Sequence, residues 1–141
     1  MTSAYFDASA LVSLFIDDEF SERVRTFVRS GSDAMVLSDW TVAEAVSAIA
    51  RGVRTRVLSA EGAQRVLAGI DGWLSSAAER LEIAPADIRA AEQILRSFDT
   101  SLRTPDALHV VVARRLQLPL VTFDLAMARD ARRLGVDVVS A

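Results

Sequence analysis

Four acidic residues stand where their carboxylates could act together. Asp7 and Asp124 each directly follow a short apolar run, and Glu44 and Asp106 each lie near the beginning of an expected helix. Neighbouring carboxylates repel one another unless a cation lies between them. Magnesium prefers oxygen ligands and is commonly held by a few carboxylates together with substrate phosphates. Two such ions about 4 Å apart stabilise the attacking and leaving oxygens of a displacement at phosphorus. The four acids therefore predict a metal site for phosphodiester chemistry.

Each of these acids also has a purely structural interpretation. Asp7 could simply end a strand, and Asp124 could cap the helix that follows it. The run 41–44 matches a capping box, in which Glu44 reaches back to a backbone N–H at the helix start. Asp106 suits the first turn of a helix, where the helix dipole favours a negative charge. Only the joint placement of the four acids favours chemistry over capping.

Two hydroxyls and the single histidine belong to the same segments. Ser9 is two residues after Asp7, and Thr122 is two residues before Asp124. Either hydroxyl could orient a carboxylate or a metal-bound water, or be an ordinary helix-start serine or strand threonine. His109 lies in a very apolar helix and has no serine or cysteine partner at a recognisable spacing. We expect this histidine to be packed in the core, with a hydrogen bond to a neighbour.

Alternating strand and helix patterns would bring the four acids to one place. Apolar periodicity predicts strands at 4–6, 34–37, 81–84, 120–123 and 136–139. It predicts helices at 9–16, 21–29, 41–54, 59–79, 85–98, from 104 to before Pro119, and a last helix that stops at Gly135, with a turn at 31–33. This alternation is typical of an α/β fold with a central, mainly parallel sheet and helices on both faces. Ligands of such sheets bind beyond the carboxyl ends of the strands, where Asp7 and Asp124 would lie.

Length and composition narrow the possible classes. We expect residues 1–141 to form a single domain, since 141 residues suffice to bury a sizeable core. No apolar run approaches the roughly 20 residues that cross a bilayer, and the first residues lack a signal-peptide pattern. The absence of cysteine excludes disulfides and thiolate metal sites. We therefore expect a cytoplasmic protein that does not enter the membrane.

The charge distribution gives a mixed indication about nucleic acid. The net charge of −3 argues against a nucleic-acid partner. All 16 basic residues are arginine, however, and arginine binds phosphate through a planar fork of donors. A GC-rich genome would also explain the arginines. Local patches can still bind RNA in an enzyme that gathers acids around metal ions. Several arginines are grouped: 51, 54 and 56; 114 and 115; 129, 132 and 133.

Four segments resemble the motifs of PIN-domain proteins. They are Phe6-Asp7-Ala8-Ser9-Ala10-Leu11-Val12, Ser38 with Thr41-Val42-Ala43-Glu44-Ala45-Val46, Pro105-Asp106-Ala107-Leu108-His109, and Leu120-Val121-Thr122-Phe123-Asp124. The resemblance runs from residue 5 to about residue 140, in order and at normal spacing, and is most specific in the last 40 or so residues.

The resemblance implies a three-layer α/β/α sandwich and a ribonuclease. PIN domains use the matched acids to bind Mg²⁺ or Mn²⁺ and cleave single-stranded RNA by metal-activated water. Short members are typically VapC-type toxins of toxin–antitoxin pairs, usually homodimers, inhibited by a small antitoxin whose tail inserts near the active site. By matched position Asp7, Glu44, Asp106 and Asp124 form the catalytic, metal-binding set, with Thr122 as the hydroxyl of the fourth motif.

One departure and three alternatives accompany this interpretation. Some PIN nucleases carry further acids just after the fourth motif, where this chain has Leu125-Ala126-Met127. We therefore expect one tightly held ion, with a second recruited by substrate. The alternatives are an RNA-processing PIN nuclease without an antitoxin, and a degenerate PIN domain that only binds RNA or protein. A magnesium phosphatase is disfavoured, since Asp7-Ala8-Ser9 offers one carboxylate where a nucleophile–acid pair is needed.

Overall fold

The computed structural model describes residues 3–31 and 34–139, so the turn expected at 31–33 lies partly outside the described residues. This part of the chain contains five strands: β1 (Ala4–Phe6), β2 (Met35–Ser38), β3 (Ala78–Leu81), β4 (Leu120–Val121) and β5 (Val138–Val139). It also contains seven helices: α1 (Ala8–Phe15), α2 (Ser21–Arg29), α3 (Asp39–Arg54), α4 (Ala60–Ser76), α5 (Pro85–Arg96), α6 (Thr104–Leu116) and α7 (Leu125–Arg133). No helix of these two ranges is both long enough and apolar enough to cross a membrane.

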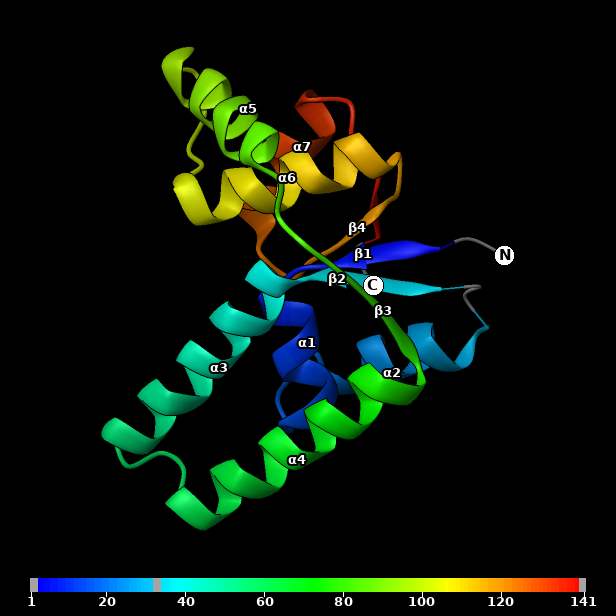
Figure 1. Ribbon diagram of the computed structural model, residues 1–141, viewed down its shortest axis with the longest axis vertical. Coiled ribbons are helices and arrows are strands. Elements are labelled where there is room, and N and C mark those ends of the chain that lie inside the picture. Colours follow the sequence, from blue (N-terminus) through cyan, green and yellow to red (C-terminus); the bar gives the residue numbers. More distant parts are fainter. Residues whose placement is uncertain (1–2, 32–33, 140–141) are drawn as a thin grey trace.

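The strands form one parallel sheet in the order β3-β2-β1-β4-β5. Helices α1 to α4 cover one face of this sheet and α5 to α7 cover the other (Figure 1). The expected three-layer sandwich with a parallel sheet is therefore confirmed. The chain runs outward from β1 through β2 to β3, then crosses to β4 and β5 on the other side of β1. The winding thus reverses at β1, and ligands of such sheets bind at the carboxyl ends of the strands beside that reversal.

One predicted strand is wrong in position. The strand expected at 81–84 lies at Ala78–Leu81, and the helix before it ends at Ser76 rather than near Glu79. The structural reason is that β3 is an edge strand that pairs only with β2. Its two middle residues, Glu79 and Arg80, are exposed, so this strand lacks the apolar pattern that marks the inner ones. Strands β4 and β5 are also shorter than expected, at two residues each.

The core is organised around β1 and α6. All three residues of β1 are fully buried, and α6 is buried continuously from Ala107 to Ala113. One apolar cluster packs α5, α6 and α7 against the sheet, and a second packs α1 to α4 against the opposite face. A helix buried on every side cannot rotate or slide without breaking contacts throughout the core. The residues at the beginning of α6, including Asp106, are thereby held in one place.

A buried carboxylate fixes the loop that leads into α6. Asp130 on α7 is 2% exposed. Its Oδ2 accepts hydrogen bonds from the Ser101 amide (3.0 Å), the Ser101 hydroxyl (2.8 Å) and the Thr100 hydroxyl (3.0 Å), while Arg133 donates to Oδ1 at 3.2 Å. Burial alone would raise the pKa of Asp130, but the hydrogen bonds outweigh it and lower the pKa to about 2. The charged form of Asp130 therefore ties this loop to α7.

Replacing this carboxylate should weaken the fold in a pH-dependent way. The pKa of Asp130 is lower in the folded chain than its ordinary value of 3.8. Its contribution is therefore fully present above about pH 4 and is lost as the pH falls toward 2. Asp130→Asn should lower the free energy of unfolding at pH 7 by about 1–3 kcal/mol, and by less at pH 3. Urea unfolding at both pH values measures this difference.

The matched control is Asp137→Asn, which changes an exposed acid. Its effect should stay within about 0.5 kcal/mol, as for other surface substitutions. An equal loss for Asp130→Asn at both pH values would contradict the role assigned to the charge.

Candidate active site

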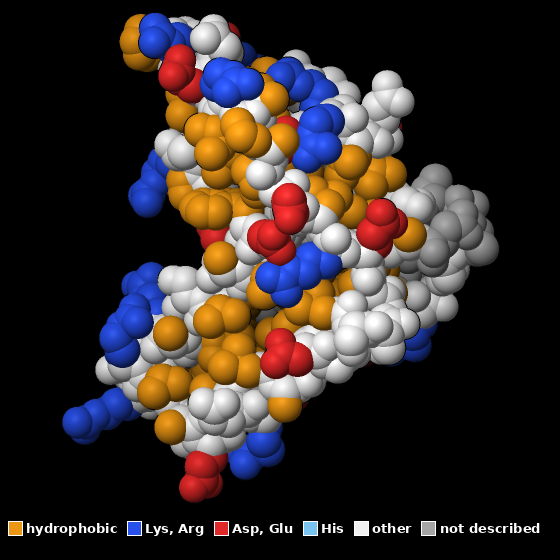
Figure 2. Space-filling view, viewed as in Figure 1, with side chains coloured by type: hydrophobic (Ala, Val, Ile, Leu, Met, Phe, Trp, Pro, Cys, Tyr) orange, Lys and Arg blue, Asp and Glu red, His pale blue; other side chains and the backbone are white. Residues whose placement is uncertain are grey.

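A small cavity lies where the sheet reverses its winding, beyond the carboxyl ends of β1 and β4. It has a volume of about 130 Å³, and all four predicted acids line it together with Ala8, Ser9, His109 and Met127. The acids come from four segments: Asp7 follows β1, Asp124 follows β4, Glu44 lies on α3 and Asp106 lies on α6. Figure 2 shows a notch in the molecular surface between α3 and α6. Residues more than 100 positions apart in the chain thus meet in one cavity.

The four carboxylates share this cavity without forming a closed cage. Within residues 3–31 and 34–139, no three acidic or histidine side chains are close enough together to hold a metal ion as they stand. The four carboxylates do not converge on one point, because each is hydrogen-bonded to a donor of its own segment or of a neighbouring element. A cation in this cavity would have to draw some of the carboxylates inward.

Asp7 is the most buried of the four acids, at 2% exposed. Its Oδ1 accepts hydrogen bonds from the Ala10 amide (2.9 Å) and the Ser9 hydroxyl (2.7 Å), and its Oδ2 accepts one from the Thr122 hydroxyl (2.5 Å). Burial raises the pKa of Asp7, while His109 and these three donors act in the opposite direction. Asp7 therefore caps α1 and is also held across the sheet by the segment after β4.

Asp124 and Asp106 are helix caps that also face the cavity. Asp124 is the N-cap of α7, and its Oδ1 accepts a hydrogen bond from the Met127 amide at 3.0 Å. The Oδ2 of Asp106 accepts one from the Arg103 amide at 3.2 Å, at the beginning of α6. The capping interpretation of both acids is thus correct, and it does not remove either carboxylate from the cavity.

The capping interpretation of Glu44 is wrong. Helix α3 begins at Asp39, and its N-cap is Ser38, whose hydroxyl accepts from the Thr41 amide at 3.2 Å. Thr41 completes this capping box by accepting from the Ser38 amide. Glu44 therefore lies beyond the first turn and turns to α6, where its Oε1 makes a short hydrogen bond with His109 Nε2.

His109 is buried and hydrogen-bonded, as expected, but its partners belong to the candidate site. Its Nδ1 makes a 3.1 Å hydrogen bond with the Tyr5 hydroxyl, while Nε2 holds Glu44. The Tyr5 hydroxyl also bonds Ser38 (2.7 Å) and Thr41 (3.2 Å). Burial raises the pKa of Tyr5 to about 12, so its hydroxyl keeps its proton at neutral pH. A buried polar chain thus connects the centre of β1 to the Glu44 carboxylate.

No sequence pattern predicted that these hydrogen-bonded side chains belong to the site. One available signal was the spacing of Asp106 and His109, because residues three apart on a helix share a face. Tyr5 gave no comparable signal, because its position in β1 reads as an ordinary core residue.

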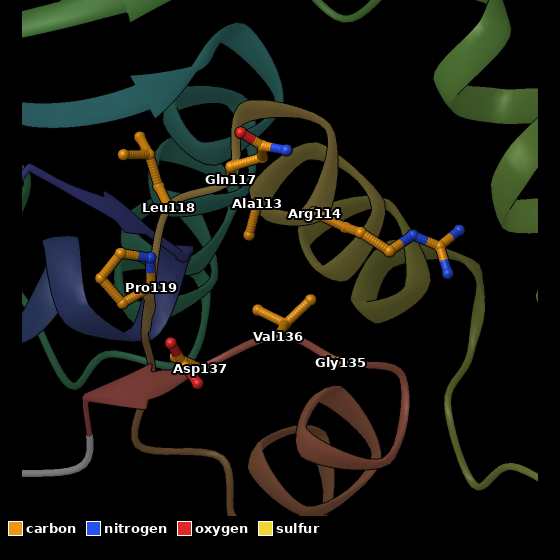
Figure 3. A pocket seen from close by; sticks show the side chains of 8 residues that line it. All are labelled: Ala113, Arg114, Gln117, Leu118, Pro119, Gly135, Val136 and Asp137. Carbon is orange, nitrogen blue, oxygen red and sulfur yellow. The ribbon is translucent and has the colours of Figure 1, made fainter.

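A larger cavity lies elsewhere and offers less chemistry. It occupies about 370 Å³ near the amino ends of β4 and β5, and Figure 3 shows the residues that line it. Its charged residues are Arg114 and Asp137, whose side chains point to different sides of the cavity in Figure 3. The small cavity is therefore the better candidate for a reaction.

Comparisons with known proteins show the family to which the chain belongs. The family model described as PIN domain matches residues 4–132. The chain is 28% identical to a protein named Ribonuclease VapC46 from Mycobacterium tuberculosis, over 99% of this chain and 98% of the relative.

Solved structures with the same fold include a toxin and a toxin–antitoxin complex. The crystal structure of VapC20 from M. tuberculosis, described as a sarcin–ricin loop cleaving toxin, superimposes with a TM-score of 0.74 and 15% identity, over 90% of this chain and 94% of that one. A toxin–antitoxin complex from Klebsiella pneumoniae gives a TM-score of 0.63 and 17% identity, over 89% of each chain. At these identities the likeness shows a shared fold.

Removing the central hydroxyl of the buried chain should destabilise the protein. Tyr5→Phe leaves the Ser38 hydroxyl and His109 Nδ1 without one of their partners. A buried polar group that loses its partner costs about 1–3 kcal/mol, so the free energy of unfolding should fall by that amount in urea titrations. Thr26→Val, which removes an exposed hydroxyl from α2, should change it by less than about 0.5 kcal/mol. If the two variants are equally stable, the buried chain does not stabilise the fold.

Proposed function

Because the chain belongs to the PIN-domain family, we propose that it is an endoribonuclease that hydrolyses single-stranded RNA with a divalent cation, Mg²⁺ or Mn²⁺. One observation carries the proposal: four carboxylates from four separate segments line one cavity at the reversal point of the sheet. We assign Asp7, Glu44, Asp106 and Asp124 as the catalytic, metal-binding residues.

The donor set fits a hard cation. Among the described residues, Asp106 Oδ1, Asp124 Oδ2 and Glu44 Oε2 take no part in the hydrogen bonds that hold these side chains. Each of these three carboxylates can therefore offer an oxygen to the cavity while its other oxygen keeps its hydrogen bond. Among the described residues that line the cavity, His109 has the only side-chain nitrogen, and both of its ring nitrogens are already bonded. Oxygen ligands of this kind suit Mg²⁺ or Mn²⁺.

The protein's own residues then have distinct tasks. A bound divalent cation supplies positive charge that offsets the phosphodiester and lowers the pKa of water. Asp7 is held rigidly by Ser9 and Thr122, which we assign as residues that orient it. Glu44 is held by His109, so its free oxygen points in a fixed direction. Such supporting hydrogen bonds typically change metal affinity or activity by 10–100-fold.

We also propose that the protein is the toxin of a toxin–antitoxin pair, acting on RNA, binding a cognate antitoxin and forming a homodimer. Its relative is named as a VapC ribonuclease, and one structural neighbour is a toxin–antitoxin complex. The surface supports the proposal of a protein partner, because an apolar groove of about 300 Å³ lies between α3 and α4. Figure 2 shows apolar side chains gathered along these two helices. Exposed apolar patches of this kind usually mark interaction sites.

Cleavage of RNA should require the metal and the carboxylates. With a panel of structured RNAs, the wild type should cleave in Mg²⁺ or Mn²⁺ and not in EDTA. Asp7→Asn and Asp106→Asn should each lower the cleavage rate at least about 100-fold, since loss of a ligand should cost no less than loss of a supporting group. Asparagine also caps helices well, so these variants keep the local fold while losing the charge.

Two further variants sharpen the test. Asp71→Asn, an exposed acid on α4, should cleave like the wild type. Thr122→Val keeps all four carboxylates and should lose about 10–100-fold. Cleavage that survives both Asp7→Asn and Asp106→Asn, or that persists in EDTA, would refute the mechanism.

Toxicity should follow the same residues. Induced expression of the wild type in a bacterial host should arrest growth, whereas Asp7→Asn at equal soluble expression should not. A small protein encoded beside the gene should restore growth when it is co-expressed. Normal growth with an active purified enzyme would instead favour an RNA-processing nuclease without an antitoxin.

A further inference from the structure

A second, more apolar pocket adjoins the acidic cavity. It has a volume of about 430 Å³ and shares Ala8, Ser9 and Asp124 with the acidic cavity. Helix α3 also connects the two, because Glu44 lines the first pocket and Ala48, one turn later on the same face, lines the second. If a phosphate of an RNA strand occupies the acidic cavity, the neighbouring nucleotide of that RNA would therefore lie at this pocket.

An aromatic pair forms one wall of this pocket. The rings of Phe20 and Phe123 stack with centroids 4.6 Å apart and an interplanar angle of 8°. Phe123 packs against the core cluster of α1 to α4, but Phe20 belongs to none of the three core clusters. The Phe20 ring stacks on Phe123, and the Phe20 amide donates to Asp18. Flat aromatic faces beside a backbone-binding site are what single-stranded nucleic acids use for stacking.

Hydrogen bonds fix both rings relative to the acids. The Ser9 hydroxyl donates to Asp7 Oδ1 at 2.7 Å and accepts from the Phe123 amide at 3.2 Å. The Asp18 carboxylate accepts from the Phe20 amide at 2.8 Å and from the Ser13 hydroxyl on α1 at 2.7 Å. Both aromatic segments are thus anchored to α1, the helix that Asp7 caps. The pocket is preorganised with respect to the reacting centre.

A positive charge lies beside the same rings. The Arg23 guanidinium is 5.9 Å from the Phe20 centroid and 6.0 Å from the Phe123 centroid, so it flanks the pair. Among the ion pairs of the described residues, none involves Arg23. Its charge is therefore available for a phosphate. An apolar, aromatic pocket with a neighbouring cation is complementary to one nucleotide, with its base and its phosphate.

We propose that this pocket is a nucleotide subsite, in which the base next to the scissile phosphate stacks on the Phe20–Phe123 pair and Arg23 contacts the adjoining phosphate. The assignment deepens the proposed nuclease function and rests on it. It predicts that the enzyme reads the flat face of a base close to the cleavage point. Stacking of this kind tolerates different bases, because every base has a flat face.

The test separates base stacking from backbone contact. The probes are fluorescent octamers of oligoadenylate and of abasic tetrahydrofuran phosphates, measured by anisotropy in EDTA so that no bond is cut. Phe20→Leu keeps an apolar side chain but removes the aromatic face, and should weaken oligoadenylate binding about tenfold. It should change abasic binding less than twofold. Phe20→Trp should retain or strengthen oligoadenylate binding.

Two variants serve as controls. Phe98→Leu makes the same change at a phenylalanine that is 93% exposed and outside this pocket, and should bind both octamers like the wild type. Arg23→Gln should weaken both octamers alike, because it removes a contact to the backbone that they share. Thermal unfolding of each variant shows whether a loss of binding follows from a loss of fold.

The outcomes are distinct. Equal losses on both octamers for a folded Phe20→Leu, or no loss on either, would overturn the subsite and leave the pocket to a protein partner. The assay needs no cleavage, so base-dependent binding in a protein that cuts no RNA would retain the subsite and refute the nuclease. Cleavage without base-dependent binding would refute only the subsite.

Discussion

The site and the fold both depend on a carboxylate buried at the end of the central strand. The three residues of β1 are fully buried, and Asp7 follows them at 2% exposed. A buried charge without partners costs several kcal/mol. Three donors offset part of this cost, one each from Ser9, the Ala10 amide and Thr122. Because Thr122 follows β4, the same bonds that make burial of Asp7 tolerable also join the two strands at which the sheet reverses its winding.

Helix capping and metal binding are compatible roles for these acids. Asp7, Asp106 and Asp124 each satisfy an amide at the beginning of a helix. For Asp106 and Asp124 this uses one carboxylate oxygen, and the other remains for the cavity. Capping also fixes the direction of each carboxylate, so little rotamer freedom remains to be lost when a cation binds. Glu44 has no amide to cap, and it is oriented instead by His109. The fold thus sets the starting direction of its acids before any ligand arrives, and a cation would then have to draw some of them inward.

The sequence predicted the parts of this arrangement that follow from strand ends and helix starts. Asp7 and Asp124 were placed correctly because parallel strands bring their carboxyl ends to one edge. The cap of α3 was misassigned because two overlapping patterns compete, one beginning at Ser38 and one at Thr41. The choice depends on where β2 ends, and that follows from pairing with β1 and β3. The contact between Tyr5 and His109, 104 positions apart, depends on the packing of α6 against β1, and no local pattern encodes it.

The distribution of arginines bears on how a chain of net charge −3 would bind the RNA of the proposed function. Sequence clustering alone misleads here, because Arg129 and Arg133 in one cluster both pair with the buried Asp130. Similarly, Arg115 is bonded to Asp87, which ties α6 to α5. Such arginines stabilise the fold and have less charge to offer a phosphate. In the proposed nuclease, the affinity for an RNA strand would then depend on arginines close to the cavity that have no acidic partner, and Arg23 is one of these among the described residues. In the proposed complex, the ion pairs of each arginine, rather than the net charge of the chain, would therefore decide where the RNA backbone can lie.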